Sequence, residues 1–141
     1  MTVAAILSAK KVSVISLTPG NLLSEACVLL AEHKIGAILI LSDEKLEGIL
    51  SERDIVRALS EKSETALEMS CASYMTASVE CCTREEPVAS VMARMTSGRF
   101  RHMPVLEGKS VVGVISIGDV VKHRIMQAEQ EAADMRAYIT G

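Results

Sequence analysis

Residues 36–56 read GAILILSDEKLEGILSERDIV, and residues 101–121 read RHMPVLEGKSVVGVISIGDVV. A shift of 65 positions aligns the two stretches without a gap. The residues that are identical at matched positions include Gly48 and Gly113, Ser51 and Ser116, and Asp54 and Asp119. Apolar residues also match apolar residues along both strand-like runs. Self-similarity at one fixed spacing indicates that the chain is a duplicated unit.

Each copy predicts the same order of elements. A short strand (12–16 or 79–82) leads through a turn (18–21 or 83–86) into a helix. The apolar residues of these helices recur every three or four positions, which is typical of one buried face: Leu23, Ala26, Cys27 and Leu30 in the first copy, and Val88, Val91, Met92 and Met95 in the second. Two aliphatic strands joined by a polar turn (42–45 or 107–109) follow, and a second helix begins at Ser51 or Ser116.

The predicted fold class is therefore α/β (α+β), built from two β-α-β-β-α repeats. One repeat has too little core to be stable alone, so the two are expected to pack sheet to sheet about a pseudo-two-fold axis. We expect the first repeat at residues 1–66 and the second at 67–126. Residues 127–141 are expected to form a helical tail, either exposed or in an oligomer contact.

The turns at 18–21 and 83–86 also contain candidate N-cap residues for the helices that follow them. Thr83, followed three residues later by Glu86, has the form of a capping box. In the first copy, Asn21 or Thr18 is the expected cap.

Composition narrows the function classes. The net charge of −3 provides no basic field for a phosphate backbone. Phe100, Tyr74 and Tyr138 are the only aromatic residues, too few for the stacking platforms of single-stranded nucleic-acid binding. The apolar runs are too short to span a bilayer, and the first residues lack the charge order of a secretory signal. A cytoplasmic protein is the default expectation.

The four cysteines lack C-x-x-C spacing, so no metal site is expected. We expect them to be reduced and packed as small hydrophobes. A redox role for Cys71 or Cys82, if exposed, is the alternative. The sequence also contains no nucleophile, P-loop or Rossmann motif, which predicts a protein that is not an enzyme.

The strongest chemical signal is the repeated Ser-x-x-Asp at Ser51–Asp54 and Ser116–Asp119. Each pair lies where a strand meets a helix, and the unpaired N–H groups of a first helical turn favour anions there. The carboxylate could accept from both ribose hydroxyls of a nucleotide. The alternative is an ordinary N-cap worth about 1 kcal/mol, and duplication would copy caps as faithfully as sites.

A basic cluster occurs in the second copy alone. Arg99, Arg101 and His102 precede a strand that contains Pro104, which cannot donate to a β-ladder. We expect this strand segment to lie at an edge or to face a ligand, with an arginine on phosphate and backbone groups on an adenine edge. The equivalent positions in the first copy are Lys34, Gly36 and Ala37, which leaves Arg53 as the main nearby cation, so the site of the second copy should be the stronger one. The alternative is that the basic residues lie on a solvated loop.

The segments ILSERDIVRAL, YMT, RFRHMPV and GVISIGDVV together resemble the CBS domain family, named after cystathionine β-synthase. The resemblance covers about residues 6–122, and the motif order is similar to that of small stand-alone two-CBS proteins. It implies a disc-like CBS pair, or Bateman module, that is usually a homodimer. It also implies up to two clefts that bind AMP, ADP, ATP, NAD(H) or S-adenosylmethionine.

By the family pattern, ribose and phosphate would be held by the Ser and Asp of each copy, helped by neighbouring residues. The adenine pocket would be lined by Thr18 and Thr83 and by the entries of the following strands. The full set of expected binding residues is Thr18, Ile35, Gly36, Ala37, Ser51, Arg53, Asp54, Thr83, Arg99, Arg101, His102, Met103, Pro104, Ser116, Gly118 and Asp119.

The expected function is thus a dimeric, non-catalytic sensor that binds an adenine nucleotide and regulates a protein target. A structural dimerisation domain is the first alternative, with the Ser-x-x-Asp motifs serving as caps. A nucleotide-processing enzyme is the second. The third is a nucleic-acid binder that uses Arg99, Arg101, Lys122 and Arg124.

Overall fold

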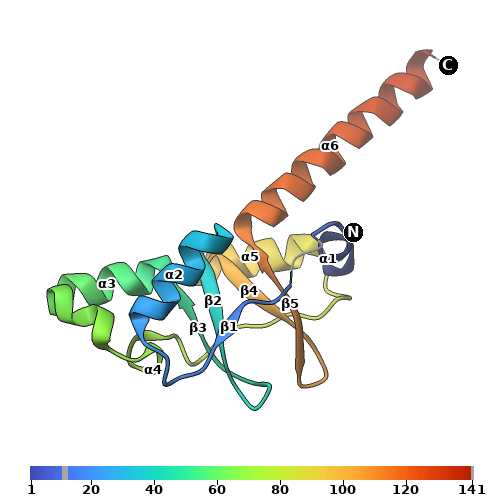
Figure 1. Cartoon of the computed structure of the whole chain (residues 1–141). Coiled ribbons are helices and arrows are strands. Elements are labelled where there is room, and N and C mark those ends of the chain that lie inside the picture. Colours follow the sequence, from blue (N-terminus) through green and yellow to red (C-terminus); the bar gives the residue numbers. More distant parts are fainter. Residues whose placement is uncertain (11–12, 141) are drawn as a thin grey trace.

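The computed structural model describes residues 1–10 and 13–140. Its elements, in chain order, are α1 Val3–Ala9, β1 Ser16–Leu17, α2 Leu23–His33, β2 Ala37–Ser42, β3 Lys45–Ser51, α3 Glu52–Lys62, the 3₁₀ helix η1 Ser63–Glu68, α4 Cys71–Tyr74, α5 Val88–Gly98, β4 His102–Glu107, β5 Ser110–Ser116 and α6 Ile117–Thr140. The predicted mixed α/β class and the duplicated helix–hairpin–helix order are confirmed (Figure 1).

The two β-hairpins have the same register. Antiparallel β2 and β3 pair Ala37 with Ser51, and antiparallel β4 and β5 pair His102 with Ser116. Each hairpin has one register shift at the matched place. Positive φ angles at the predicted turns (48° at Asp43, for example) allow the chain to reverse within a few residues.

The two sheets differ in their first strand. β1 pairs in parallel with β2, and the Leu39 N–H donates to the Ile15 carbonyl at 3.3 Å. Pro104 takes the place of Leu39 in the second copy and has no N–H to donate to the matched carbonyl of Glu80. The strand predicted at 79–82 is accordingly reduced to one parallel bridge between Cys82 and Val105. In the first copy the strand predicted at 12–16 is shifted to β1; residue 12 lies outside the described residues.

The predicted caps of α2 and α5 are wrong. The N-cap of α5 is Pro87, and the Glu86 carboxylate instead accepts from Arg94 at 2.8 Å. At α2 the Asn21 side chain accepts from the Thr18 N–H at 2.8 Å and closes the preceding turn. The first turn of α2 is held by Glu25, whose carboxylate accepts from the backbone N–H of the residue before the helix at 2.9 Å.

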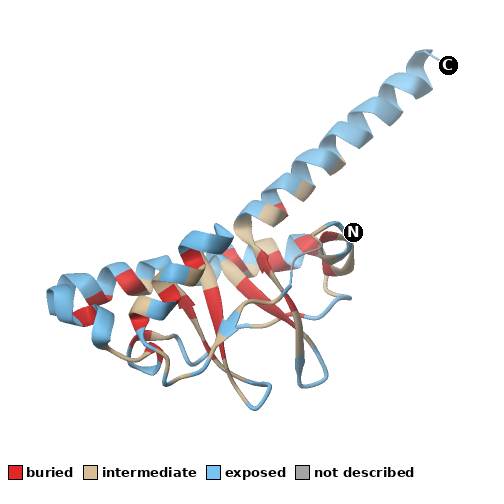
Figure 2. Cartoon of the chain, viewed as in Figure 1, coloured by how far each residue is buried: buried red, intermediate tan, exposed pale blue. Residues whose placement is uncertain are grey.

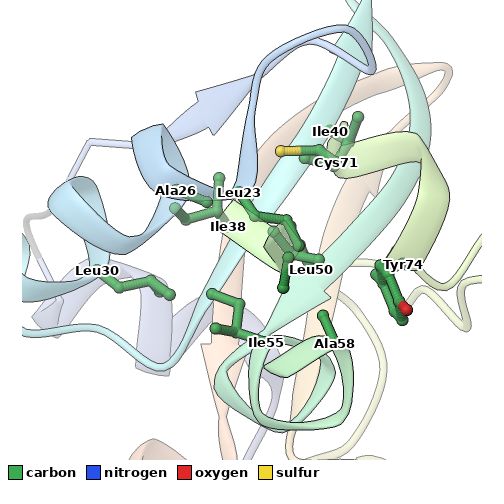
Figure 3. Packing of buried hydrophobic residues seen from close by; sticks show 11 residues of the cluster. Leu23, Ala26, Leu30, Ile38, Ile40, Leu50, Ile55, Ala58, Cys71 and Tyr74 are labelled. Atoms are coloured by element: carbon green, nitrogen blue, oxygen red, sulfur yellow. The ribbon is translucent and has the colours of Figure 1, made fainter. Parts of the chain in front are cut away.

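The protein has two hydrophobic cores, and each core includes a short segment of the other repeat. The first core lies between α2, α3 and the β2–β3 hairpin, and it also takes in Cys71 and Tyr74 of α4 (Figure 3). The second core lies between α5, β4, β5 and the base of α6, and it takes in Val3 and Ile6 of α1. The segment at the start of each repeat therefore packs into the core of the other repeat: α1 into the second core and α4 into the first.

The expected tail is the outer part of one continuous helix, α6, which includes residues on both sides of position 126. Only Val120 of this helix is buried. Beyond its base, α6 projects away from the two repeats and is pale blue along its length in the burial view (Figures 1 and 2).

Candidate functional site

Both Ser-x-x-Asp motifs form N-caps. The Ser51 hydroxyl accepts from the Asp54 N–H at 3.3 Å, and the Asp54 carboxylate accepts from the Ser51 N–H at 2.8 Å. Ser116 and Asp119 make the same two bonds at 3.1 and 2.9 Å. A carboxylate has about four lone-pair sites, so the cap leaves each aspartate with capacity for further donors.

A cavity of about 510 Å³, here called cavity 1, lies beside the first motif. It is lined from the first repeat by residues that include Gly36, Ile49, Ser51, Glu52, Arg53 and Asp54, and from the following chain by Thr76, Ser78, Val79, Glu80, Gly98, Arg99, Phe100, Arg101 and His102. Both repeats therefore contribute to it.

A second cavity of about 830 Å³, cavity 2, lies beside the other motif. Ser116, Asp119 and residues 112–114 line it from the second repeat. The remaining lining includes Ala4, Leu7, Ser8, Lys10, Ser13, Val14, Ile15, Lys34, Ile35, Gly36, Ala37, Arg84 and His102. Cavity 2 is thus the pseudo-symmetric counterpart of cavity 1.

The grouping of charges differs from the sequence expectation. Arg99 and Arg101 were expected to share a site with Asp119, but they line the same cavity as Asp54. The reason is geometric: each strand entry points across the pseudo-two-fold interface toward the cap of the other repeat. The arginines and Arg53 form no ion pair among the residues that the structure describes, so their charges are available to an anion.

Cavity 2 contains a built-in partner for its aspartate. The Lys10 ammonium, which follows α1, lies 2.7 Å from Asp119 and donates to the Val114 carbonyl at 2.8 Å. Burial raises the pKa of the Asp119 carboxyl, but the hydrogen bonds and charge of Lys10, together with bonds from Ser116, outweigh it and leave the pKa lowered. Asp119 is therefore ionised and paired.

His102 and Gly36 line both cavities. A Cβ atom at Gly36 would lie 3.1 Å from the His102 ring, so the glycine lets the ring approach the other repeat closely. Burial lowers the pKa of His102, and the nearby charge of Lys10 lowers it further against the opposing pull of Glu52 and Asp119. A neutral imidazole therefore separates the two cavities near pH 7.

Five of the expected binding residues line neither cavity. Thr18 and Thr83 are exposed at the turns before α2 and α5, and Gly118 is exposed in the first turn of α6. Met103 and Pro104 are buried. Their strand, β4, lies at an edge of the two-stranded β4–β5 sheet beside the 79–82 segment, which is the first of the two placements expected for it.

The sequence reasoning missed the lining residues that precede each repeat. Lys10 is one, and Ser78, Val79 and Glu80 are others. The repeat already matched Ser13 and Val14 with Ser78 and Val79, and this was the one signal that could have indicated them. Lys34 and Arg84 are further cations of cavity 2 outside the expected set. Lys34 lies at the position matched to Arg99, and both residues have positive φ at a helix end.

Cys71 and Cys82 pack in the two cores as small hydrophobes, as expected, and the alternative of an exposed, redox-active cysteine is wrong for both. Their side chains are 0% and 3% exposed. Burial raises the pKa of the Cys71 thiol to about 11 and that of Cys82 to about 12. Since the thiolate is the reactive form, both thiols are inert structural residues.

Within residues 1–10 and 13–140, no three His, Cys, Asp or Glu side chains are grouped as they would be around a metal ion. None of the helices described combines the length and apolar character needed to cross a bilayer.

Comparison with known proteins identifies a family and similar proteins. The model of the CBS domain family matches residues 6–61 and 71–125. The mitochondrial CBS domain-containing protein CBSX3 of Arabidopsis thaliana is 30% identical over 129 residues, which are 88% of this chain. The chain spans 63% of the length of that plant protein.

Solved structures resemble the whole arrangement. The CBS-domain containing protein ATU1752 of Agrobacterium tumefaciens is 38% identical, with a TM-score of 0.85 over 88% of this chain and 99% of its own. The CBS domain pair of protein MJ0100 is 25% identical, with a TM-score of 0.79 over 92% of this chain and 98% of its own. That pair was solved in complex with 5-methylthioadenosine and S-adenosyl-L-methionine.

Proposed function

Because the chain belongs to the CBS domain family, we propose that it is a non-catalytic sensor that binds adenine nucleotides between its two repeats. The observation that carries this proposal is cavity 1, where the Ser51–Asp54 cap of one repeat and the arginines of the other line one space. The adenosine compounds bound by the MJ0100 pair support the ligand class.

Each part of a nucleotide has a matching group in cavity 1. The Asp54 carboxylate accepts from the ribose hydroxyls, and Arg99 and Arg101 pair with phosphate through charge-assisted hydrogen bonds. The Glu80 carbonyl receives no ladder bond from Pro104 and can accept from the adenine amino group. Cavity 1 therefore takes a nucleotide that carries phosphate, such as AMP, ADP or ATP.

Cavity 2 has different electrostatics, and we expect it to bind differently. Lys10 lies 2.7 Å from Asp119, and Arg84 is paired with Glu107 at 3.3 Å. Asp54 of cavity 1 is paired more loosely, with the exposed Arg57 side chain at 3.3 Å. A ligand must displace the lysine from the aspartate before the ribose can use that carboxylate. Cavity 1, which holds the arginines expected to make the stronger site, is therefore the tighter site for AMP, with Asp54 in place of Asp119. Cavity 2 is left for a second adenosine compound such as NAD(H).

Sensing requires that the ligand bind two arrangements of the repeats with different affinities. Both cavities lie at the junction of the repeats and share His102 and Gly36. Occupancy of one cavity therefore changes the spacing of the repeats and, through it, the surface offered to a protein target. We retain a cytoplasmic location as a prediction.

Calorimetric titration with AMP, ATP, NADH and adenosine tests the proposal. Arg101→Gln should weaken AMP binding by about tenfold, the loss expected for one charge-assisted hydrogen bond, and leave adenosine binding unchanged. Lys45→Gln is the matched control and should bind AMP like the wild type, because it removes one positive charge at the turn of the β2–β3 hairpin, outside the lining of both cavities. Absence of AMP and ATP binding at millimolar concentration would refute the proposal.

A structural module that binds no nucleotide is the second candidate, and the bonds within the two caps favour it. Each motif satisfies its own serine N–H and hydroxyl without a ligand. This candidate predicts one melting temperature with and without millimolar AMP. A rise in the melting temperature that saturates with ligand excludes it, because ligand binding to the folded state must stabilise it.

A further inference from the structure

The outer part of α6 has an apolar stripe that no described residue of the chain covers. Exposure of its large side chains increases along the helix, from 46% at Val121 to 75% at Ile139. The helix leaves the body of the molecule, as Figure 2 shows. Contacts with the body use other positions, because Val120 is buried and the His123 ring meets the Met1 side chain.

The stripe has the spacing of a coiled coil. Its members alternate at intervals of four and three residues, which is the a/d pattern of a heptad repeat. In order they are Val121, Ile125, Ala128, Ala132, Met135 and Ile139. With Ile125, Ala132 and Ile139 at a positions, Val120 and His123 fall at c and f, on the side away from the stripe. The face that packs on the body and the heptad stripe are therefore separate.

The charges that flank the stripe select its partner. In a parallel pair of identical helices, each g position meets the e position five residues later in the other copy. Arg124 then faces Glu129 of the second copy, and Glu131 faces Arg136 of the second copy. Both contacts are attractive, and two-fold symmetry makes each of them twice.

The antiparallel arrangement of the same stripe is disfavoured. In the antiparallel pair, Glu129 would face Glu129 of the second copy, and Glu131 would face Glu131 of the second copy. Lys122 would face Arg136 of the second copy. These are all like-charge contacts, which destabilise helix pairs.

We propose that two copies of this chain associate through α6 as a parallel, in-register, two-stranded coiled coil. The stripe is shorter than three full heptads, so the helix base that is anchored in the second core helps to hold it in a helical conformation. The pairing places two nucleotide-sensing bodies side by side at the amino-terminal end of the coil, and it does not depend on nucleotide binding.

Disulfide cross-linking of the full-length protein tests both the interface and its direction. Met135→Cys places a thiol at a d position, where the two parallel copies meet across the stripe. Ala137→Cys is the matched control, because Ala137 is also exposed on the same helix but lies at an f position. Under mild oxidation with diamide, we expect a disulfide-linked dimer with Met135→Cys and wild-type background with Ala137→Cys.

A charge exchange in the Met135→Cys background tests the flanking pairs. Arg124→Glu should reduce the cross-linked fraction by about tenfold at a fixed protein concentration, because two attractive contacts become repulsive. Adding Glu129→Arg should restore it. Absence of the Met135→Cys cross-link, or equal cross-linking of the control, would overturn the proposal even if the protein is dimeric by another route.

Discussion

The contact between Lys10 and Asp119 allows a quantitative test of how α1 is held on the second repeat. The two charged atoms are 2.7 Å apart, and the side chains are only 31% and 25% exposed. An exposed ion pair contributes at most about 1 kcal/mol. Partial burial and the second bond from Lys10 to the Val114 carbonyl place this one at the upper end, so we expect a coupling free energy of about 1 kcal/mol.

A double-mutant cycle isolates that coupling. Lys10→Met keeps the methylene packing and removes the charge, and Asp119→Asn keeps an oxygen that can accept from the Ser116 N–H. Urea unfolding at pH 7 should show that the double variant loses about 1 kcal/mol less than the sum of the two single variants.

The Asp54–Arg57 pair provides a matched control within the same molecule. It joins positions three residues apart on α3 at 3.3 Å, and the arginine side chain is 53% exposed. Its coupling should be only about 0.3 kcal/mol. If the Lys10–Asp119 cycle shows no more coupling than this control, the ion pair does not hold α1, and the proposed competition between Lys10 and ribose fails with it.

Three further predictions concern the pH dependence of Asp119, two glycines and the buried thiols. The pKa of Asp119 is lowered in the folded state. Its ion pair therefore stabilises the protein above the unfolded-state pKa of about 3.9, and this stabilisation is lost as the pH falls through the folded-state pKa. The unfolding free energies of the wild type and Asp119→Asn should become equal in acid. Gly48→Ala would place a Cβ atom 2.8 Å from the backbone oxygen of Thr76, which cannot rotate away, and should lower the unfolding free energy by about 1–3 kcal/mol. Gly118→Ala, with its nearest neighbour at 3.6 Å, should not lower it. Native-state thiol labelling should leave Cys71 and Cys82 unmodified until the protein unfolds, and rapid labelling of either would contradict their burial.

Local patterns were sufficient for most of the secondary structure. The apolar spacing of α2 and α5 and the polar turns between the strands depend on neighbours within a few residues, and both were predicted correctly. The Ser51 and Ser116 caps are equally local. The errors occurred where a local motif competed with a tertiary partner: Glu86 could have capped a helix through Thr83, but Arg94 binds its carboxylate instead.

The sequence by itself determined the duplication, the two capped strand–helix junctions and the charged heptad pattern of α6, because each is a property of residues close together in the chain or repeated at one fixed interval. Only the tertiary structure decided which arginines lie beside which aspartate. Arg99 and Asp54 are far apart in sequence, and they line one cavity because the repeats pack about a pseudo-two-fold axis that carries each strand entry across to the other repeat's cap. The contact between Lys10 and Asp119 has the same origin, because α1, at the start of the chain, packs into the core of the second repeat.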